Sequence, residues 1–305
     1  MKTFSIKKLL VTTVMASAIM PYMSAIASTA SIKQKLATIE ASYDGRIGIS
    51  AINTANNETI QYRENERFPF CSTSKVMAVA AILKRSMHES NYLQKNIIYK
   101  SDDVVTHSPI TEKNIEKGMT ISELSEATLT TSDNTAMNLL LKELGGPSAV
   151  TKFARSIGDF QYRLDRWEPE LNSSIPGDKR DTTTPMAMGK SLKNLILGKT
   201  LGTEQRKQLW VWLKNNTTGD TRIRAGVPKG WIVGDKTGGG DYGTTNDIAI
   251  IYPPHCKPIV LVVYFTQFKK DATRKDEVIA RVTRSVLDEF AQFDKCIKND
   301  LSIKV

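Results

Sequence analysis

Residues 70–84 of this 305-residue chain read FCSTSKVMAVAAILK and combine a hydroxyl–amine pair with a helix-forming run. Ser72 and Lys75 are three residues apart, so on a helix their side chains lie on one face and can touch. Free backbone N–H groups in the first turn would favour negative charge at Ser72. Burial disfavours the ammonium form of Lys75, and a neutral lysine can activate a serine without histidine. A serine N-cap followed by a solvated lysine is the alternative interpretation.

Strand-like runs occur near both ends of the chain, with helical runs between them. The expected strands cover residues 47–53, 59–63, 230–237, 244–252 and 258–265. Besides the helix after Pro69, the expected helices cover residues 30–42, 121–129, 134–144, 148–157, 185–198, 202–214 and 276–293. These elements predict an α/β fold with an all-α lobe: an antiparallel sheet built from both termini and covered by helices, with an inserted helical domain.

The expected α/β domain comprises residues 28–66 and 215–305, and the expected all-helical domain comprises residues 67–214. Residues 158–184 of the helical part, with residues 163–181 at their centre, lack a helical period, and long irregular segments of this kind are often functional. A cleft between the two domains is the expected ligand site.

The first 27 residues predict a cleaved export signal. A basic start with Lys2, Lys7 and Lys8 precedes an apolar run, and residues 25–27 (Ala-Ile-Ala) fit a cleavage site. The run is too short to span a bilayer comfortably, and no later stretch approaches a membrane span. A periplasmic or secreted protein is therefore expected, whose net charge falls from +10 to +7 when the three leader lysines are removed. No basic cluster alternates with aromatics, so no nucleic-acid partner is expected.

The three histidines and three cysteines show no metal-ligand spacing, and no Gly-x-Ser-x-Gly motif occurs. A zinc hydrolase and a Ser-His-Asp hydrolase are therefore disfavoured. If a serine is the nucleophile, its base must be a lysine or a carboxylate.

Two later tripeptides supply further polar groups. Ser-Asp-Asn at residues 132–134 falls between two expected helices, and Lys-Thr-Gly at residues 236–238 ends an expected strand. Alone, they fit an N-cap and a strand end with a glycine turn. In this order after Ser-x-x-Lys, they form a signature of class A β-lactamases and penicillin-binding proteins. Residues 163–172 (RLDRWEPELN) resemble the omega loop of class A serine β-lactamases, and the chain resembles this family from about residue 30 to 295.

The resemblance implies a role for each catalytic residue. Ser72 would attack the lactam carbonyl, and Lys75, or Glu168 acting through a water, would take its proton. The backbone N–H groups of Ser72 and Gly239 would form an oxyanion hole. Ser132 would pass a proton to the lactam nitrogen. Glu168 would also deprotonate the water that hydrolyses the acyl-enzyme.

The resemblance also implies which residues bind the substrate, a small-molecule β-lactam. Asn172 would help the glutamate hold the hydrolytic water, and Asn134 would hold the side-chain amide of the substrate. Lys236 and Thr237 would bind its carboxylate beside Gly238, whose missing side chain lets a ligand approach the backbone. The family further implies a monomer and a mechanism that needs no metal or organic cofactor.

Other residues lie at positions that are structural or variable in the family. Arg166 and Asp181 would form the ion pair that closes the omega loop. Many relatives carry an arginine shortly after Lys-Thr-Gly, which is absent here. Arg222 is the predicted substitute, with a structural surface arginine as the alternative. His107 stands where relatives often have an aromatic residue at the cleft mouth, and an exposed loop residue is equally compatible.

The cysteines allow one disulfide whose formation the sequence does not decide. Strand 258–265 would rise about 26 Å and helix 276–293 about 27 Å. A helix that runs back along this strand would therefore bring Cys296 close to Cys256. Export permits the bond, but the Cα atoms must approach within about 7 Å, so free thiols are the alternative. Some relatives pair the cysteine before the nucleophile with one after Lys-Thr-Gly. Gly240 occupies that second position here, so Cys71 is expected to be buried and free.

A periplasmic serine β-lactamase is the leading interpretation. A penicillin-binding DD-peptidase shares the three short motifs, and a non-catalytic penicillin-sensing module would be acylated without hydrolysis. Glu168 with Asn172 disfavours both alternatives, because these residues serve the hydrolytic water.

Overall fold

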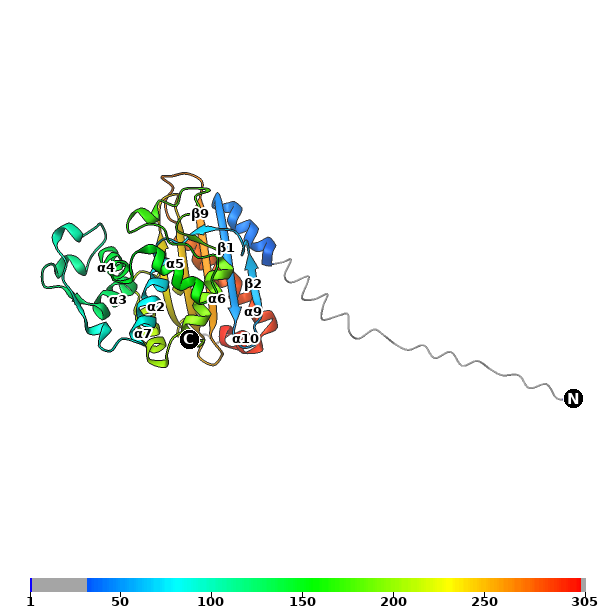
Figure 1. The fold of residues 1–305 in the computed structure, drawn as a ribbon. Helices are drawn as coiled ribbons and strands as arrows, with labels where there is room; N and C mark the ends of the chain where they lie inside the picture. The colour runs from blue at the N-terminus through cyan, green and yellow to red at the C-terminus, as the bar shows by residue number, and fades with distance from the viewer. Residues whose placement is uncertain (2–31, 303–305) are drawn as a thin grey trace.

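The computed structural model describes residue 1 and residues 32–302, so the expected signal peptide lies outside the described residues. In this part of the chain, five antiparallel strands form one sheet in the order β2-β1-β9-β8-β7 (Figure 1). The strands are β1 (Gly45–Asn53), β2 (Thr59–Tyr62), β7 (Ile232–Gly239), β8 (Thr245–Tyr252) and β9 (Ile259–Gln267). β1 pairs with β9 along its whole length. The predicted sheet built from both ends of the chain is therefore confirmed.

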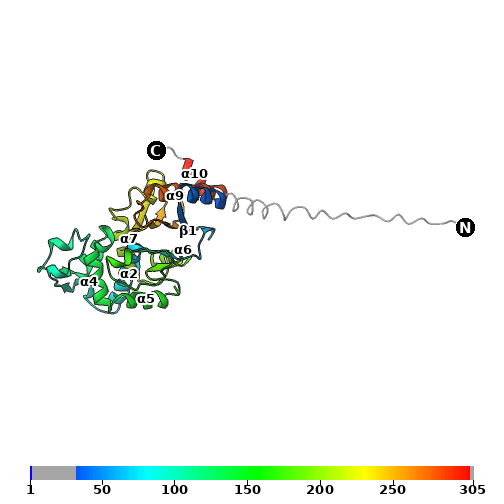
Figure 2. The same cartoon turned by 90° about the horizontal axis from the view of Figure 1, so that it is seen from above.

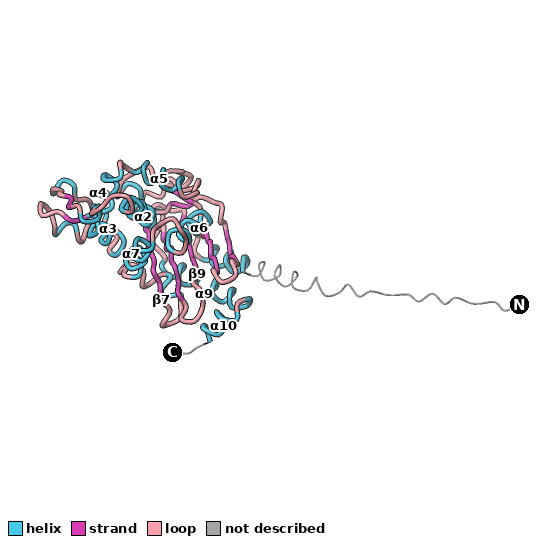
Figure 3. Tube along the Cα trace, turned by 60° about the horizontal axis from the view of Figure 1, so that its bottom comes forward, coloured by secondary structure: helices cyan, strands magenta, loops and turns pink. Residues whose placement is uncertain are grey.

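Helices cover both faces of this sheet, as the view from above shows (Figure 2). α9 (Asp276–Phe293), α10 (Lys295–Ser302) and a helix over residues 32–42 lie on one face, and α6 (Pro185–Ile196) lies on the other. The other α-helices are α2 (Lys75–Ser86), α3 (Ile121–Thr130), α4 (Asn134–Leu144), α5 (Pro147–Ser156), α7 (Thr203–Lys214) and α8 (Ile223–Gly226). The tube view shows most of these helices gathered beside the β7 edge of the sheet (Figure 3).

Short elements connect the helices. Two-residue strands pair as β3 (Phe68–Pro69) with β6 (Thr182–Thr183), and as β4 (Asn96–Ile97) with β5 (Met119–Thr120). The 3₁₀ helices are η1 (Cys71–Ser74), η2 (Tyr92–Gln94), η3 (Ser101–Asp103), η4 (Thr111–Lys113) and η5 (Glu170–Asn172). Ser72 therefore lies in a 3₁₀ turn just before α2, and not in the first turn of the α-helix as expected.

The alternation of side chains along the strands divides the core into two clusters. On β9, Val260, Val262 and Tyr264 face the helices of residues 67–214, while Leu261 and Val263 face α9. The first cluster continues without a break into α2, α4 and α6. The helices of residues 67–214 and the face of the sheet that carries Val260, Val262 and Tyr264 therefore share one hydrophobic core. In residues 32–302, no helix is long and apolar enough to cross a membrane.

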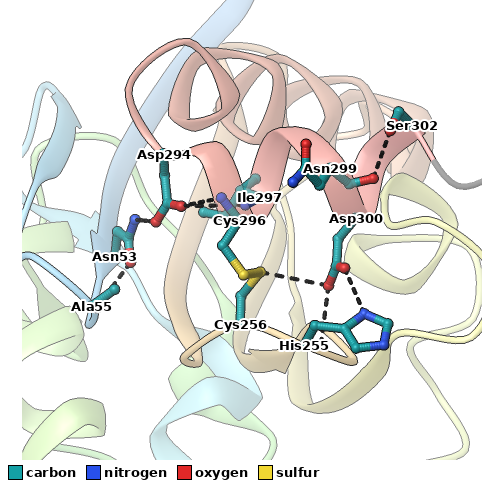
Figure 4. Close-up of a disulfide and its surroundings, with 10 residues drawn as sticks. All are labelled: Asn53, Ala55, His255, Cys256, Asp294, Cys296, Ile297, Asn299, Asp300 and Ser302. Atoms are coloured by element: carbon teal, nitrogen blue, oxygen red, sulfur yellow. Dashed lines mark hydrogen bonds and ion pairs between the residues drawn. A yellow bond between two sulfur atoms is a disulfide. The ribbon is translucent and has the colours of Figure 1, made fainter.

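A disulfide joins Cys256, in the turn after β8, to Cys296 in α10, with the Cα atoms 5.8 Å apart (Figure 4). α10 was not expected from the sequence. Asp294 caps it by accepting from the backbone N–H of Cys296 at 2.8 Å and also accepts from Asn53 at the end of β1. His255 Nδ1 lies 2.8 Å from the buried Asp300 carboxylate. α10 is thus attached to the end of β1 and to the turn between β8 and β9.

Removing this disulfide is expected to destabilise the protein and leave catalysis unchanged. The bond joins residues 40 positions apart, and loop-closure entropy predicts a stabilisation of roughly 3–4 kcal/mol for such a ring. Cys256→Ser and Cys296→Ser, each and together, should lower the denaturation midpoint by similar amounts. Reduction of the wild type should have the same effect, with kcat/KM retained. Equal midpoints for the oxidised and reduced wild type would contradict this expectation.

Candidate active site

A cleft of about 620 Å³ lies between the edge strand β7, the start of α4 and η5 of the omega loop. It brings together segments that are far apart in the sequence. Among the residues that line it are Ser72, His107, Ser132, Asn134, Asn172, Thr218, Arg222, Thr237, Gly238, Gly239 and Arg274. Lys75, Glu168 and Lys236 are buried and hydrogen-bond to these residues.

The turn that carries Ser72 is fixed by its neighbours on the sheet. Asn246 of β8 donates its side-chain amide to the backbone oxygens of Pro69 at 2.8 Å and Phe70 at 3.2 Å. Cys71 is a buried free thiol, as expected, and its φ of +50° turns the chain sharply before the serine. Burial raises the pKa of this thiol to about 12, so it stays protonated at neutral pH. These contacts present the Ser72 hydroxyl to the cleft.

Lys75 lies at the centre of the buried polar groups. Its Nζ donates to Ser72 Oγ at 3.0 Å and to Asn134 Oδ1 at 2.7 Å, and it lies 3.0 Å from Glu168 Oε1. Burial lowers the pKa of Lys75, and this effect outweighs the opposing pull of Glu168. Ser72 Oγ in turn donates to Glu168 Oε1 at 3.3 Å. The serine hydroxyl is therefore in contact with two groups that can exchange its proton.

Ser132 lies between two lysines. Its Oγ accepts from Lys75 Nζ at 3.2 Å and from Lys236 Nζ at 3.0 Å. Because both lone pairs of the hydroxyl are then occupied, its own proton is free to point into the cleft. Asp133 holds the short connection between α3 and α4 in place. It is the N-cap of α4, and its carboxylate also accepts from the backbone N–H groups of Ile110 and Thr111.

The omega loop places Glu168 and Asn172 beside Ser72. Asn172 Nδ2 donates to Glu168 Oε2 at 2.5 Å, while Asn172 Oδ1 is buried and accepts no hydrogen bond from the described residues. The backbone of Glu168 is held by Asn138 of α4 through bonds of 3.0 and 2.9 Å. A buried acceptor beside a carboxylate and a serine hydroxyl is a suitable site for a reactive water.

Arg166 and Asp181 form an ion pair at the neck of the omega loop, with Nε 2.5 Å from Oδ2. Asp181 also accepts from the backbone N–H groups of Asp165 and Arg166. The guanidinium extends to Ser173 Oγ at 2.9 Å, next to Asn172. The pair therefore connects the two ends of the loop with the segment that carries the reactive groups.

The β7 end of the cleft is positively charged. Burial, with the neighbouring charge of Lys75, lowers the pKa of Lys236 to about 7. Arg222 is 5% exposed, pairs with Asp276 at 2.9 Å, and donates Nη1 to the backbone oxygens of Gly238 and Asn246. Arg274 lies so close to β7 that a Cβ on Gly239 would lie 2.8 Å from its Nη1. Cationic groups from three segments therefore converge on one part of the cleft.

Some site residues were not found from the sequence. Asn138 follows Asn134 by one helical turn on α4, which is a signal that could have revealed it. Arg274 and Thr218 lie on irregular segments, where no periodicity indicates the direction of a side chain. His107 lines the cleft, and its Nε2 lies 3.2 Å from the carbonyl oxygen of Thr131. Within residues 32–302, no three His, Cys, Asp or Glu side chains gather as a metal site.

Comparison with known proteins reveals extensive similarity. The model of the β-lactamase enzyme family matches residues 31–290. A β-lactamase of Proteus vulgaris is 58% identical over 260 residues, which cover 85% of this chain and 96% of that protein. The β-lactamase Toho-1 of Escherichia coli is 53% identical over 292 residues, which cover 95% of this chain and 100% of that protein.

Solved structures agree with these relatives. A crystal structure of a β-lactamase from Desulfarculus baarsii has a TM-score of 0.85 at 48% identity, covering 86% of this chain and 98% of that one. A variant of the last common ancestor of Gram-negative class A β-lactamases has a TM-score of 0.84 at 50% identity, covering 87% and 100%. The family model, the similar sequences and the similar structures each cover most of the chain, and all of them are β-lactamases. The chain therefore belongs to the class A β-lactamases, serine enzymes that hydrolyse the amide bond of β-lactam antibiotics and so confer resistance to them.

Proposed function

We propose that this chain opens the β-lactam ring by transferring the acyl group to Ser72. The observation that carries the proposal is the contact of Ser72 Oγ with both Lys75 Nζ and Glu168 Oε1. Either group can take the serine proton as Oγ attacks the lactam carbonyl. β7 is an edge strand, so its outer backbone groups have no strand partner. The N–H groups of Gly239 and Ser72 then stabilise the developing oxyanion.

The free proton of Ser132 completes the ring opening. Ser132 Oγ is held by the Nζ atoms of two lysines and can donate its proton to the departing lactam nitrogen. Lys75 is in position to return a proton to Ser132. Asn134 holds the amide of the substrate side chain at the other wall of the cleft, next to His107.

Hydrolysis of the acyl-enzyme is assigned to Glu168 and Asn172. The buried Oδ1 of Asn172 accepts a hydrogen bond from one O–H of the water, and Glu168 removes the proton of the other O–H as the water attacks the ester. Arg166 and Asp181 keep both residues in place through the neck of the loop. This second step distinguishes a β-lactamase from a penicillin-binding protein that remains acylated.

Lys236, Thr237 and Arg222 are proposed to bind the substrate carboxylate. Arg222→Ala is expected to raise KM for benzylpenicillin by roughly 10- to 100-fold, because a hydrogen bond to a charged group contributes about 1.5–3 kcal/mol. Arg222→Lys keeps the charge and should recover part of the loss. The denaturation midpoint should be measured alongside, because Arg222 also bonds to two backbone oxygens. An unchanged KM in Arg222→Ala would contradict the assignment and leave Arg222 with a structural role.

The experiment that tests the proposed function is turnover of excess nitrocefin by the mature protein, with the protein mass followed in parallel. Many turnovers per protein, lost in Ser72→Ala, would support the proposal. One stoichiometric burst with a lasting mass adduct would instead indicate a DD-peptidase or a penicillin sensor.

We also propose that residues 1–27 direct export to the periplasm or the medium, which the N-terminal sequence of the mature protein tests.

A further inference from the structure

We propose that Thr218 makes the carboxylate end of the cleft selective for an anion by controlling the hydroxyl of Thr237. This inference rests on the proposed function, in which Thr237 binds the substrate carboxylate. Thr218 lies on the segment between α7 and α8 and lines the cleft beside Thr237. The two hydroxyl oxygens are 2.5 Å apart. The hydroxyl assigned to the substrate is therefore already bonded to a protein group in the described site.

A buried chain of hydrogen bonds continues behind Thr218. Its Oγ1 donates to Asn216 Oδ1 at 2.9 Å, and Asn216 Nδ2 donates to Asp235 Oδ2 at 2.5 Å. The other oxygen of Asp235 accepts from Arg224 Nε at 2.6 Å. Gly219 has no side chain, and a Cβ there would collide with the Asp235 carboxylate. The segment that carries Thr218 and Gly219 is thus packed directly against the buried Asp235. The chain of hydrogen bonds ends at Thr237.

The chemistry of these groups fixes the direction of the chain. A carboxylate only accepts hydrogen bonds, so Asp235 holds Asn216 with its NH₂ group inward and its oxygen toward Thr218. Thr218 has one hydroxyl proton and gives it to that oxygen. It can then only accept at its other side, so Thr237 must donate its own proton to Thr218. Without substrate, the Thr237 proton therefore points away from the ligand position.

A bound carboxylate reverses the bond between the two threonines and breaks the bond from Thr218 Oγ1 to Asn216 Oδ1. Thr237 turns its proton to the anion, and Thr218 can turn its proton to Thr237, because Asn216 Oδ1 still accepts from the Thr218 backbone N–H at 3.2 Å. A charged acceptor strengthens the two bonds that then run from Thr218 through Thr237 to the ligand, whereas a neutral acceptor competes poorly for the Thr237 proton that Thr218 already accepts. Thr218 thus favours a carboxylate over a neutral group, without touching the reacting atoms.

The test compares benzylpenicillin with its methyl ester, which lacks the negative charge. The quantity measured is the ratio of kcat/KM for the acid to kcat/KM for the ester. This ratio does not depend on how much of a variant is folded. Thr218→Val should lower the ratio about fivefold, and Thr218→Ser, which keeps the hydroxyl, should retain it. In a Thr237→Val background, adding Thr218→Val should leave this ratio unchanged.

Thr217→Val is the matched control. Thr217 is exposed and bonds to the carbonyl oxygen of Thr130, which keeps a bond from the Thr217 backbone N–H when the hydroxyl is removed. The ratio of kcat/KM for the acid to kcat/KM for the ester should be the same in Thr217→Val as in the wild type. A Thr218→Val ratio within twofold of wild type, or an equal drop in the Thr237→Val background, overturns the inference while penicillin hydrolysis persists. A wild type that fails to hydrolyse benzylpenicillin overturns the proposed function itself.

Discussion

Glu168→Ala should still be acylated by β-lactams and should then remain trapped as the acyl-enzyme. Glu168 is the carboxylate that contacts both Ser72 and Asn172, so in the proposed mechanism its removal leaves the hydrolytic water without a base. General bases typically contribute a factor of about 10²–10⁴, and deacylation should slow by this amount. The measurement is the protein mass after mixing with benzylpenicillin, followed by the rate at which the adduct disappears.

Glu170→Ala is the matched control for this experiment. It removes the same charge from the same loop, but Glu170 is exposed and two residues further on. Its deacylation rate should stay close to that of the wild type. If Glu168→Ala showed no adduct at all, Glu168 would be required for acylation, and Lys75 alone would not suffice as the base. If it turned over normally, another group would have to activate the water.

Arg166→Ala should have the second largest effect, because it opens the neck of the omega loop. Asp181 is 1% exposed and would lose its guanidinium partner. Breaking a buried pair in this way costs about 3–5 kcal/mol, and the two backbone N–H groups that still donate to Asp181 favour the lower end. We expect a lower denaturation midpoint, faster proteolysis within residues 163–181, and slower deacylation.

Arg163→Ala provides the comparison. Arg163 also pairs with an aspartate in this loop, Asp165, but its side chain is 45% exposed. An exposed pair contributes about 1 kcal/mol or less, so this variant should resemble the wild type in all three measurements. Wild-type stability and protease resistance in Arg166→Ala would show that the neck does not depend on the ion pair.

The parts of the site that could be predicted from the sequence are those set by local geometry or by motifs. Ser72 and Lys75 are close because residues three apart share a helix face, and the pair forms even though Ser72 lies in a 3₁₀ turn. The meeting of Ser132 with Lys236 depends on how two distant segments pack. Their spacing says nothing about it, and it was expected only through the family resemblance.

The parts that were missed depend on irregular segments or on weak patterns. Arg274 precedes α9 in a loop without periodicity, and only the packing against Gly239 reveals its place. The chain from Asp235 through Asn216 to Thr218 requires side-chain directions that no motif supplies. α10 has a single buried apolar residue, Ile297, too few to predict a helix. Its attachment depends instead on the disulfide and on the buried Asp300.

The pairing of β1 with β9 has a consequence for the order in which the protein can form during synthesis. β1 is complete at residue 53, but the neighbour that it needs spans residues 259–267. Until then, β1 has only β2 as a partner, and an isolated two-stranded hairpin is at best marginally stable in water. The sheet, including the β7 edge of the cleft, therefore cannot close until nearly the whole polypeptide has emerged. A growing chain is therefore expected to lack its complete sheet until residues 259–267 have been made.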